Sequence, residues 1–465
     1  MSGAGAGTDL VQAGGEGAVP PHEPEGESLR TKAVRGSIWT LLGYGGGQAW
    51  RLLSHWILAK ILSPGDFGLM LLVLTVIVSL EMVSDLGQYL FVQRDPRGAE
   101  PRVRDSAFTL QVVRGVVLAI ATTSLAHPVA AYYGRPELVG LLIASALNQL
   151  VAAVQPMALF VAARNLEVKK LTYLDLSSQI LGSLATIALA LYLRSAWALV
   201  LGTVVGTVCK VGLAYVMVAD RRDRLVFDPP MLRELLRFGR WTAVSSTLYL
   251  MSRQIDKFFL GPRVGDAFLG LYYAGGNLAE PIVNANSRLS GQVLFPVMAQ
   301  VLNSPTGQGA RMYAAARRRI DLLFMPAAGG LFALAPVVVG LFYDERYEGA
   351  APILRFFAAQ AVLRCLIEPA NQVVYALGHA HMITLSNVLR AALILGGVPL
   401  AYSRWGVDGL LWALVGAEAP VLVVLWVHLA RRRLLPWRAE VVALLVALAT
   451  AALTLWAGRL VGLPL

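Results

Sequence analysis

Nine arginine and lysine side chains lie inside segments that otherwise have the composition of membrane spans. Arg51 is the clearest case, because it lies between the largely apolar stretches 38–42 and 56–62. A charged side chain at the centre of a bilayer costs roughly 2.5 to 3.5 kcal/mol, so nine of them facing lipid would cost more than the net stability of a typical fold. We therefore expect most of the following to face a hydrated interior: Arg51, Arg114, Lys210, Arg253, Lys257, Arg288, Arg355, Arg364 and Arg390.

The spacing of these cations places several on shared helix faces. Arg51 and His55 are four residues apart, and Arg253 is followed by Asp256 and Lys257 at three and four residues. A guanidinium forks onto two oxygens of an anion such as phosphate and stays charged at any cellular pH, so the pattern indicates a cationic, anion-binding wall. A packing role, with each arginine neutralised by a nearby carboxylate, is the alternative. The expected anion-binding set is Arg51, His55, Arg114, Arg253, Lys257 and Arg288.

Four carboxylates inside the predicted spans are candidates for binding a coupling ion. Glu81 and Asp85 are four residues apart and are expected to share one face of the second span. Asp256 and Glu280 lie in the seventh and eighth spans. A desolvated carboxylate takes up a proton or Na⁺ readily, but a role as counter-ion to an arginine is equally compatible with these positions.

Other polar or reactive side chains in the spans have simpler interpretations. Arg364 and Glu368 lie at i and i+4, and we expect them to form an ion pair with each other. Cys209 and Cys365 both lie in apolar segments, so the sequence indicates neither a disulfide framework nor a cysteine metal site. We expect no metal site and no cofactor apart from a coupling H⁺ or Na⁺.

The elements that must position these residues are membrane helices. Of the 465 residues, 56% are hydrophobic and only 15% are charged, and the mean hydropathy is +0.60. Apolar segments of about 20 to 27 residues recur along the chain without residue-by-residue alternation, which predicts an all-α polytopic membrane bundle and not a barrel. The expected spans are 36–62, 66–92, 106–133, 137–163, 171–193, 196–218, 237–262, 268–298, 320–343, 350–376, 379–402, 408–430 and 440–460.

Positive charge is distributed unevenly between alternate loops. One set of loops carries about 24 arginines and lysines, including Arg222 and Arg319, whereas the other carries about seven, including Arg263 and Arg346. The positive-inside rule places the N-terminus and the basic loops in the cytoplasm. The net charge of +11 thus reflects topology, and no nucleic acid partner is expected. Residues 1–28, rich in Gly, Ala, Pro and Glu, are expected to form a disordered cytoplasmic tail.

A weak internal repeat relates two parts of the chain. Residues 35–69 align on 237–271 without a gap, at an offset of 202. Trp and Arg are rare in such helices, and both recur in the alignment. The identical pairs are Arg35 and Arg237, Trp39 and Trp241, Thr40 and Thr242, Arg51 and Arg253, Leu58 and Leu260, Gly68 and Gly270, and Leu69 and Leu271.

The repeat predicts two six-helix lobes, 29–222 and 223–435, followed by an extra C-terminal helical region, 436–465, with one or two helices. Six spans per lobe give both lobes the same orientation, so the pseudo-two-fold axis is expected to run along the membrane normal. Arg51 and Arg253 would then lie at equal depth and face one another across the lobe interface.

Four short stretches of the sequence resemble a known transporter family: LSPGDFGLMLLVLT (62–75), SDLGQYLFVQR (84–94), RQIDKFFLGPRVGDAFLGLYYAG (253–275) and LFPVMAQ (294–300). They resemble the Wzx-type flippases, the polysaccharide-transport branch of the multidrug/oligosaccharidyl-lipid/polysaccharide exporter superfamily. The resemblance covers roughly residues 30–435. It implies two six-helix lobes around a central cavity, and translocation of undecaprenyl-diphosphate-linked oligosaccharides across the bacterial inner membrane by alternating access.

The resemblance also implies an identity for the anion. Arg51 and Arg253 would bind the diphosphate while the polyprenyl tail stays in the lipid bilayer. A polysaccharide polymerase and a chain-length regulator are the further partners implied. Many family members have an even number of spans, so the thirteen expected here depart from the family pattern.

Two alternatives stay open beside a flippase. A cation-coupled multidrug exporter of the same superfamily would need an anionic cavity, whereas the mid-membrane residues here contain an excess of arginine. A membrane glycosyltransferase or polymerase would need a large outer loop with carboxylates, and the outer loops here are only a few residues long. No GxSxG, HExxH, Walker or GxGxxG context occurs in the sequence, so we expect a transporter and not an enzyme.

Overall fold

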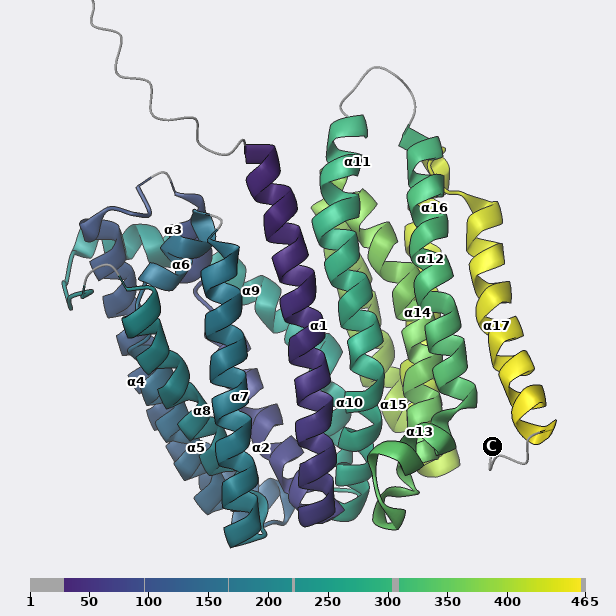
Figure 1. Ribbon diagram of the computed structural model, residues 1–465, viewed down its shortest axis with the longest axis horizontal. Coiled ribbons are helices and arrows are strands. Elements are labelled where there is room, and N and C mark those ends of the chain that lie inside the picture. Colours follow the sequence, from purple (N-terminus) through teal and green to yellow (C-terminus); the bar gives the residue numbers. More distant parts are fainter. Residues whose placement is uncertain (1–28, 96, 166, 220–221, 303–308, 461–465) are drawn as a thin grey trace, which may run out of the picture.

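The computed structural model describes residues 29–95, 97–165, 167–219, 222–302 and 309–460 (Figure 1). Within these ranges all regular structure is helical, which confirms the predicted all-α membrane bundle. The helices fall into a first helix group, α1–α8, and a second helix group, α10–α17, and α9 runs between them (Figure 1). The predicted N-terminal tail lies outside the described residues.

Each predicted span coincides with one helix, with two or three consecutive helical segments, or with part of a bent helix. In the described chain the bounds are α1 Leu29–Ile61, α2 Pro64–Val83, α3 Gln88–Arg94, α4 Pro101–Tyr133, α5 Glu137–Ala153, α6 Ala158–Arg164, α7 Val168–Leu193, α8 Ala196–Met217, α9 Pro229–Leu260, α10 Asp266–Leu289, η1 Ser290–Leu294, α11 Phe295–Leu302, α12 Gly309–Ala333, α13 Ala335–Phe342, η2 Glu345–Tyr347, α14 Ala350–Ala376, α15 Ala380–Gly416, α16 Glu418–Arg431 and α17 Trp437–Leu460. Here η1 is a π-helix and η2 a 3₁₀-helix.

Not every predicted span is apolar enough to qualify as a membrane span by composition. In the described part of the chain, seven helical stretches qualify, and nine do so if the bent pairs α5 with α6 and α12 with α13 each count as one. The pairs are bent by 60° and 80°. Helices α1, α9 and α10 do not qualify, because polar and charged side chains interrupt their apolar residues. These three helices line the central cavity described below, so their polar side chains need not face lipid.

The eleventh and twelfth predicted spans share one continuous helical stretch that bends sharply at Gly406. Gly406 has a φ of 61° and a ψ of −144°, a combination that residues with a Cβ rarely adopt. The chain folds back so closely that a Cβ on Gly409 would lie 2.4 Å from the oxygen of Ala401. Helix α15 therefore contains the first of these spans and the beginning of the second, which α16 completes.

The second predicted span is broken after Val83, where α2 ends. Asp85 lies in the turn that follows, and its Oδ1 accepts a hydrogen bond of 2.9 Å from the backbone N–H of Gly87. The prediction that Asp85 shares a helix face with Glu81 is therefore wrong. An aspartate two residues before a glycine stabilises a turn by this local hydrogen bond, and that bond competes with helix continuation.

A reciprocal contact joins α2 to α10. A Cβ on Gly68 would lie 2.0 Å from the oxygen of Asp266, and a Cβ on Gly270 would lie 1.7 Å from the oxygen of Pro64. Adding the repeat offset of 202 to positions 64 and 68 gives 266 and 270, so the two contacts exchange equivalent residues. Such an exchange is characteristic of a contact about a two-fold axis. Helix α1 likewise packs on α7 and its repeat partner α9 on α15.

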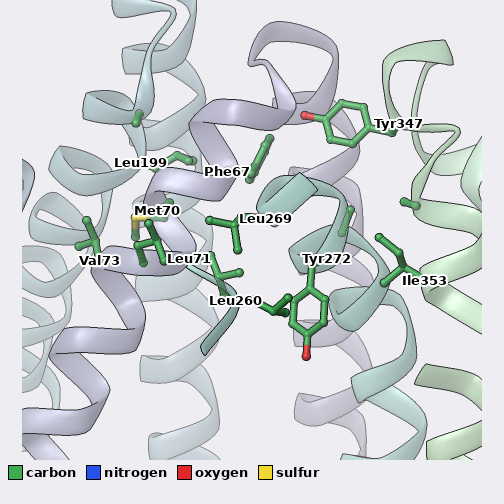
Figure 2. Packing of buried hydrophobic residues seen from close by; sticks show 14 of the residues in the cluster. Phe67, Met70, Leu71, Val73, Leu199, Leu260, Leu269, Tyr272, Tyr347 and Ile353 are labelled. Atoms are coloured by element: carbon green, nitrogen blue, oxygen red, sulfur yellow. The ribbon is translucent and has the colours of Figure 1, made fainter. Parts of the chain in front are cut away.

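The two ends of the bundle differ in charge. We call the end with α3, α6 and the α8–α9 connection the basic end, because it carries Arg97, Arg102 and Arg164. The opposite end holds the loops 134–136 and 261–265. Near the opposite end, apolar side chains of α2, α9, α10 and α14 form a buried core that keeps these helices together (Figure 2). Its members include Phe67, Leu260, Leu269 and Ile353.

Candidate substrate-binding cavity

A cavity of about 440 Å³ lies between the two helix groups, lined by α1, α2, α9, α10, α14 and α15. Five charged side chains among the described residues line it: Arg51, Asp256, Lys257, Glu280 and Arg364. Three cations against two carboxylates leave one positive charge in excess. In a cavity with low-dielectric walls this excess favours an anion.

The cavity starts inside the bundle, next to the packed residues of the opposite end, and extends toward the basic end. Its lining residues on α2 run from Leu71 to Met82, and those on α10 run from Tyr272 to Val283. The first turns of both helices precede these positions, and they are packed against one another at Gly68 and the residues around it. The close contact of α2 and α10 therefore forms the floor of the cavity.

Arg51 is the cation with the most evident unused binding capacity. Its Nε and Nη2 atoms are buried and have no hydrogen-bond partner among the described residues. Leaving charged donors buried and unpaired costs about 1 to 3 kcal/mol or more, because water is lost without replacement. Nε and Nη2 form one edge of the guanidinium, the edge that binds two oxygens of a phosphate or carboxylate in parallel.

The neighbours of Arg51 on α1 hold the helix against α7. The carbonyl of Gly47 accepts a hydrogen bond of 3.0 Å from Gln179 Nε2 of α7. Trp50 Nε1 donates to Ser183 Oγ, also of α7, at 2.5 Å. Since these polar groups bind the face of α1 toward α7, the rotation of α1 is fixed with Arg51 on the cavity side.

Helix α9 supplies a cation and a carboxylate from adjacent positions. Lys257 Nζ lies 3.4 Å from Asp256 Oδ1, and the hydroxyl of Tyr272 on α10 donates to Asp256 Oδ2. The same helix carries Arg253, whose side chain lies outside the described residues. The predicted approach of Arg51 and Arg253 across the interface therefore stays a prediction.

Arg364 is a cavity residue whose ion-pair partner the sequence did not identify. Its Nε lies 2.9 Å from Glu418 Oε1, an interhelical ion pair where the sequence predicted an intrahelical pair with Glu368. Glu418 is 1% exposed, and its second oxygen lies 2.9 Å from Arg390 Nη2. Glu368 accepts hydrogen bonds from Ser287 Oγ at 3.1 Å and from a glutamine of its own helix. Glu418 thus holds Arg364 at the cavity wall.

A second cavity, of about 260 Å³, lies within the first helix group and is lined by Arg114 and Glu81. Arg114 Nε donates to Ser84 Oγ at 3.1 Å, and its Nη2 donates to the carbonyl of Glu81 at 2.7 Å. The guanidinium therefore satisfies a carbonyl in the last turn of α2, where helical partners are missing. This placement separates Arg114 from the central cavity.

Two other predicted anion-binding residues also lie outside the central lining. His55 packs among aromatic rings, with centroid distances of 6.1 Å to Phe67 and 5.8 Å to Tyr273. Arg288 is exposed, and its guanidinium carbon lies 4.5 Å from the ring centroid of Tyr44. Of the predicted binding and coupling residues, the structure brings together Arg51, Lys257, Asp256 and Glu280, and it places His55, Arg114, Arg288, Glu81 and Asp85 elsewhere.

Residues 57–352 match a family model described as polysaccharide biosynthesis protein. The chain belongs to this family. The match runs from the end of α1 to the start of α14, so it includes the Gly68–Gly270 contact and most of the cavity lining but neither Arg51 nor Arg364. The predicted resemblance to polysaccharide-transport proteins is confirmed.

Two curated relatives extend the similarity over most of the chain. The teichuronic acid biosynthesis protein TuaB of Bacillus subtilis is 24% identical over 311 residues, 65% of this chain and 62% of TuaB. The lipopolysaccharide biosynthesis protein WzxC of Escherichia coli is 22% identical over 391 residues, 82% of this chain and 77% of WzxC. The chain thus spans less than two thirds of the length of the first of these relatives.

A solved structure extends the comparison to the whole fold. The lipid II flippase MurJ in an inward closed conformation superposes with a TM-score of 0.67 at 12% identity, covering 90% of this chain and 91% of MurJ. The fold is therefore that of a multi-pass membrane transporter. The prediction of a transporter, and not an enzyme, agrees with this fold.

Proposed function

We propose that this protein is a flippase that moves a polyprenyl-diphosphate-linked oligosaccharide across the bacterial inner membrane for polysaccharide assembly. The observation that carries the proposal is the unpaired guanidinium edge of Arg51, buried beside the cavity between the helix groups. A diphosphate supplies the two parallel oxygens that this edge binds. The names of TuaB, WzxC and MurJ support a role in moving or assembling cell-surface polymers.

The other cations of the cavity support the same substrate class. A cation about 4 Å from a phosphate charge gains on the order of 4 kcal/mol at an effective dielectric near 20. That gain offsets part of the cost of removing the phosphate from water. With Lys257 and Arg364 in the same lining, the excess positive charge attracts a diphosphate, whereas an organic cation would add to that excess.

Transport then follows from alternating access. The head group enters the cavity from the basic end, which we assign to the cytoplasm, and the polyprenyl tail stays in the bilayer. A relative movement of the two helix groups opens the opposite end and releases the head group. A polysaccharide polymerase and a chain-length regulator would act on the product, and a coupling ion would set the direction.

The test is a flipping assay with the purified chain in liposomes. The probe is a polyprenyl-diphosphate-linked trisaccharide with a fluorophore on its sugar, and a quencher outside the liposomes reports which leaflet holds it. We expect Arg51→Ala to lower the flipping rate at least tenfold, and Arg51→Lys to restore it only partly, because an ammonium cannot fork across two oxygens. The thermal stability of each variant is measured in parallel.

The matched control is Arg404→Ala, which removes an exposed cation outside the cavity lining. It should flip the probe at the original rate. Full flipping by Arg51→Ala would contradict the proposed binding role. Transport of an organic cation in place of the probe would favour the multidrug exporter.

Orientation has its own test. Reporters fused after Arg222 or Arg319 should report the cytoplasm, and reporters fused after Arg263 or Arg346 should report the outside. Reversal of either pair would contradict the assignment of the basic end.

A further inference from the structure

A buried ionic cluster joins α12, α14 and α17, away from the central cavity. Arg317 is 0% exposed, and all three nitrogens of its guanidinium have partners. Its Nε lies 2.9 Å from Asp321 Oδ2, and its Nη2 lies 2.9 Å from Glu440 Oε2. Its Nη1 donates to the carbonyl of Leu366 at 2.8 Å. We call Arg317, Asp321 and Glu440 the Arg317 cluster.

The charges of the cluster do not balance. Nε and Nη2 form one edge of a guanidinium, which ordinarily binds the two oxygens of a single carboxylate. Here two carboxylates share that edge, and both are buried, with Asp321 5% exposed and Glu440 0% exposed. If both were ionised, one negative charge would be left without a counter-ion in the interior. An unpaired buried charge is strongly destabilising.

The second oxygen of each carboxylate shows where the compensating cation would bind. Asp321 Oδ1 and Glu440 Oε1 are buried and have no hydrogen-bond partner among the described residues. The indole of Trp426 on α16 lies near Glu440, but its Nε1 forms no hydrogen bond of normal geometry. An ionised carboxylate oxygen left in this state carries a large desolvation penalty.

The neighbouring titratable groups do not supply a positive charge. Tyr313 on α12 lies beside Arg317, and Cys365 on α14 lies near both Arg317 and Asp321. Glu368, also on α14 and near Cys365, carries a further carboxylate. These groups are neutral or negative, so Arg317 is the cation that the described neighbours of the two carboxylates provide.

We propose that the Arg317 cluster is a proton-binding site that holds one proton, shared between Asp321 and Glu440, at neutral pH. One proton makes the cluster neutral and turns a free carboxylate oxygen into a hydrogen-bond donor. Glu440 lies in the first turn of α17, and α17 packs mainly on α12. Loss of the proton would therefore leave a repulsive pair of carboxylates in the contact that attaches α17 to the bundle.

The first experiment detects the proton directly. Infrared spectra of the purified full chain in detergent, without substrate, should contain the carbonyl-stretch band of a protonated carboxyl group at neutral pH. Glu440→Gln and Asp321→Asn should each lose that band, because the remaining carboxylate pairs with Arg317 as an ion. Asp408→Asn, which replaces an exposed carboxylate on α15, is the control and should keep it.

The second experiment measures linkage between the proton and folding. The folded chain would hold one proton that the ionised carboxylates of the unfolded chain lack, so stability must fall as the pH rises through neutrality. One proton corresponds to a tenfold fall in the ratio of folded to unfolded protein per pH unit. Glu440→Gln and Asp321→Asn should remove this slope, and Asp408→Asn should retain it.

Two results would overturn the proposal. One is an unchanged pH slope and an unchanged infrared band in both Glu440→Gln and Asp321→Asn. The other is stabilisation of the unaltered chain by Na⁺ over K⁺ at constant ionic strength, lost in Glu440→Gln and without a protonated-carboxyl band, which would make the occupant a metal cation. Neither measurement uses the flippase substrate, so each outcome is independent of the function proposed above.

Discussion

The two helix groups meet in different ways at the two ends of the bundle. At the opposite end the contact is made largely by backbone atoms: Gly68 and Gly270 bring α2 and α10 together, and Arg346 Nη2 donates to the carbonyl of Ala59 at 2.8 Å. The hydroxyl of Tyr347 donates to the carbonyl of Leu62 at 3.3 Å. These groups lie at the ends of helices, where carbonyl oxygens lack helical partners.

At the basic end the connection runs through α9. Its first turns lie beside the first helix group, with ion pairs of 2.7 Å from Arg97 to Glu234 and 2.5 Å from Arg102 to Asp228. Further along, α9 packs on α15 of the second helix group. Exposed ion pairs of this kind contribute about 0 to 1 kcal/mol each.

The difference between the contacts at the two ends indicates which end is closed in this conformation. Backbone contacts without intervening side chains separate all at once or stay together, because close-packed atoms do not stretch apart gradually. Exposed side-chain pairs exchange with water at little cost. The structure is therefore a state sealed at the opposite end, in which α9 connects the two groups at the basic end.

The largest expected effect comes from Gly270. A Cβ there would lie 1.7 Å from the oxygen of Pro64, so Gly270→Ala must push α10 away from α2. We expect it to destabilise the sealed state by about 1 to 3 kcal/mol and to stop flipping of the labelled probe. Thermal unfolding and the flipping assay measure both effects.

The control for this change is Gly46→Ala on α1. A Cβ at Gly46 would meet no atom within 4 Å, so the variant should keep activity and gain up to about 1 kcal/mol of helix stability. Equal activity of Gly270→Ala and Gly46→Ala would show that the close contact does not matter for transport.

Chemical labelling tests from which side of the membrane the cavity and the sealed region can be reached. In a chain lacking Cys209 and Cys365, Val283→Cys introduces a thiol in the cavity lining, and Leu269→Cys introduces one in the sealed region. A charged thiol reagent should reach position 283 from the basic side and not from the other side. Position 269 should react from neither side. Reaction of either thiol from the opposite side would show that this end is open.

A smaller difference is expected between the losses of folding stability caused by replacing two arginines, one at each end of the bundle. Arg346→Ala leaves the carbonyl of Ala59 without its charged donor, which should cost about 1 kcal/mol. Arg102→Ala removes only an exposed pair, and its effect should be at or below that value, since Arg102 is 62% exposed. Denaturant titration of both variants measures the difference. A larger loss in Arg102→Ala would place the firmer contact at the basic end.

Residue patterns predicted the helices well because apolar length is a local property of the sequence. The bend at Gly406 and the turn at Asp85 were missed as structural features, although both contain a glycine that breaks helical continuity. Hydropathy alone does not distinguish a gap between two spans from a bend within one helical stretch. The helices with the poorest apolar signal, such as α1, were still identified as spans.

The candidate site was predicted in part for a related reason. Arg51 was found because an arginine amid apolar residues is conspicuous in the sequence. The role of Arg364 was missed because its ion-pair partner Glu418 is 54 positions away, and no local spacing joins them. Arg114 was grouped with Arg51 by charge alone, whereas the fold places it in another cavity. Sequence spacing identifies neighbours within a helix and leaves contacts between helices undetermined.

The smallest expected effect is the pH dependence of stability that comes from the carboxylates of the ion pairs at the two ends. Hydrogen bonds from Arg102 lower the pKa of Asp228 below its ordinary value of 3.8, and those from Arg346 lower the pKa of Asp344 in the same way. A carboxylate whose pKa is lowered by folding contributes stability above its ordinary pKa, and that stability is lost as the pH falls through the folded-state pKa.

Asp228→Asn tests the pair at the basic end alone, because asparagine keeps the helix cap that Asp228 forms with the N–H of Met231. The variant should match the unaltered chain only when the pH falls below the folded-state pKa of Asp228, where both residues are neutral, and should be slightly less stable at neutral pH. Added salt should remove that difference, since an exposed pair is screened. Asp344→Asn should respond less to salt, because its arginine also binds the carbonyl of Ala59. Equal salt responses of the two variants would show that both ends are joined by surface charge. The proposed difference between backbone contacts at the opposite end and exposed ion pairs at the basic end would then be wrong.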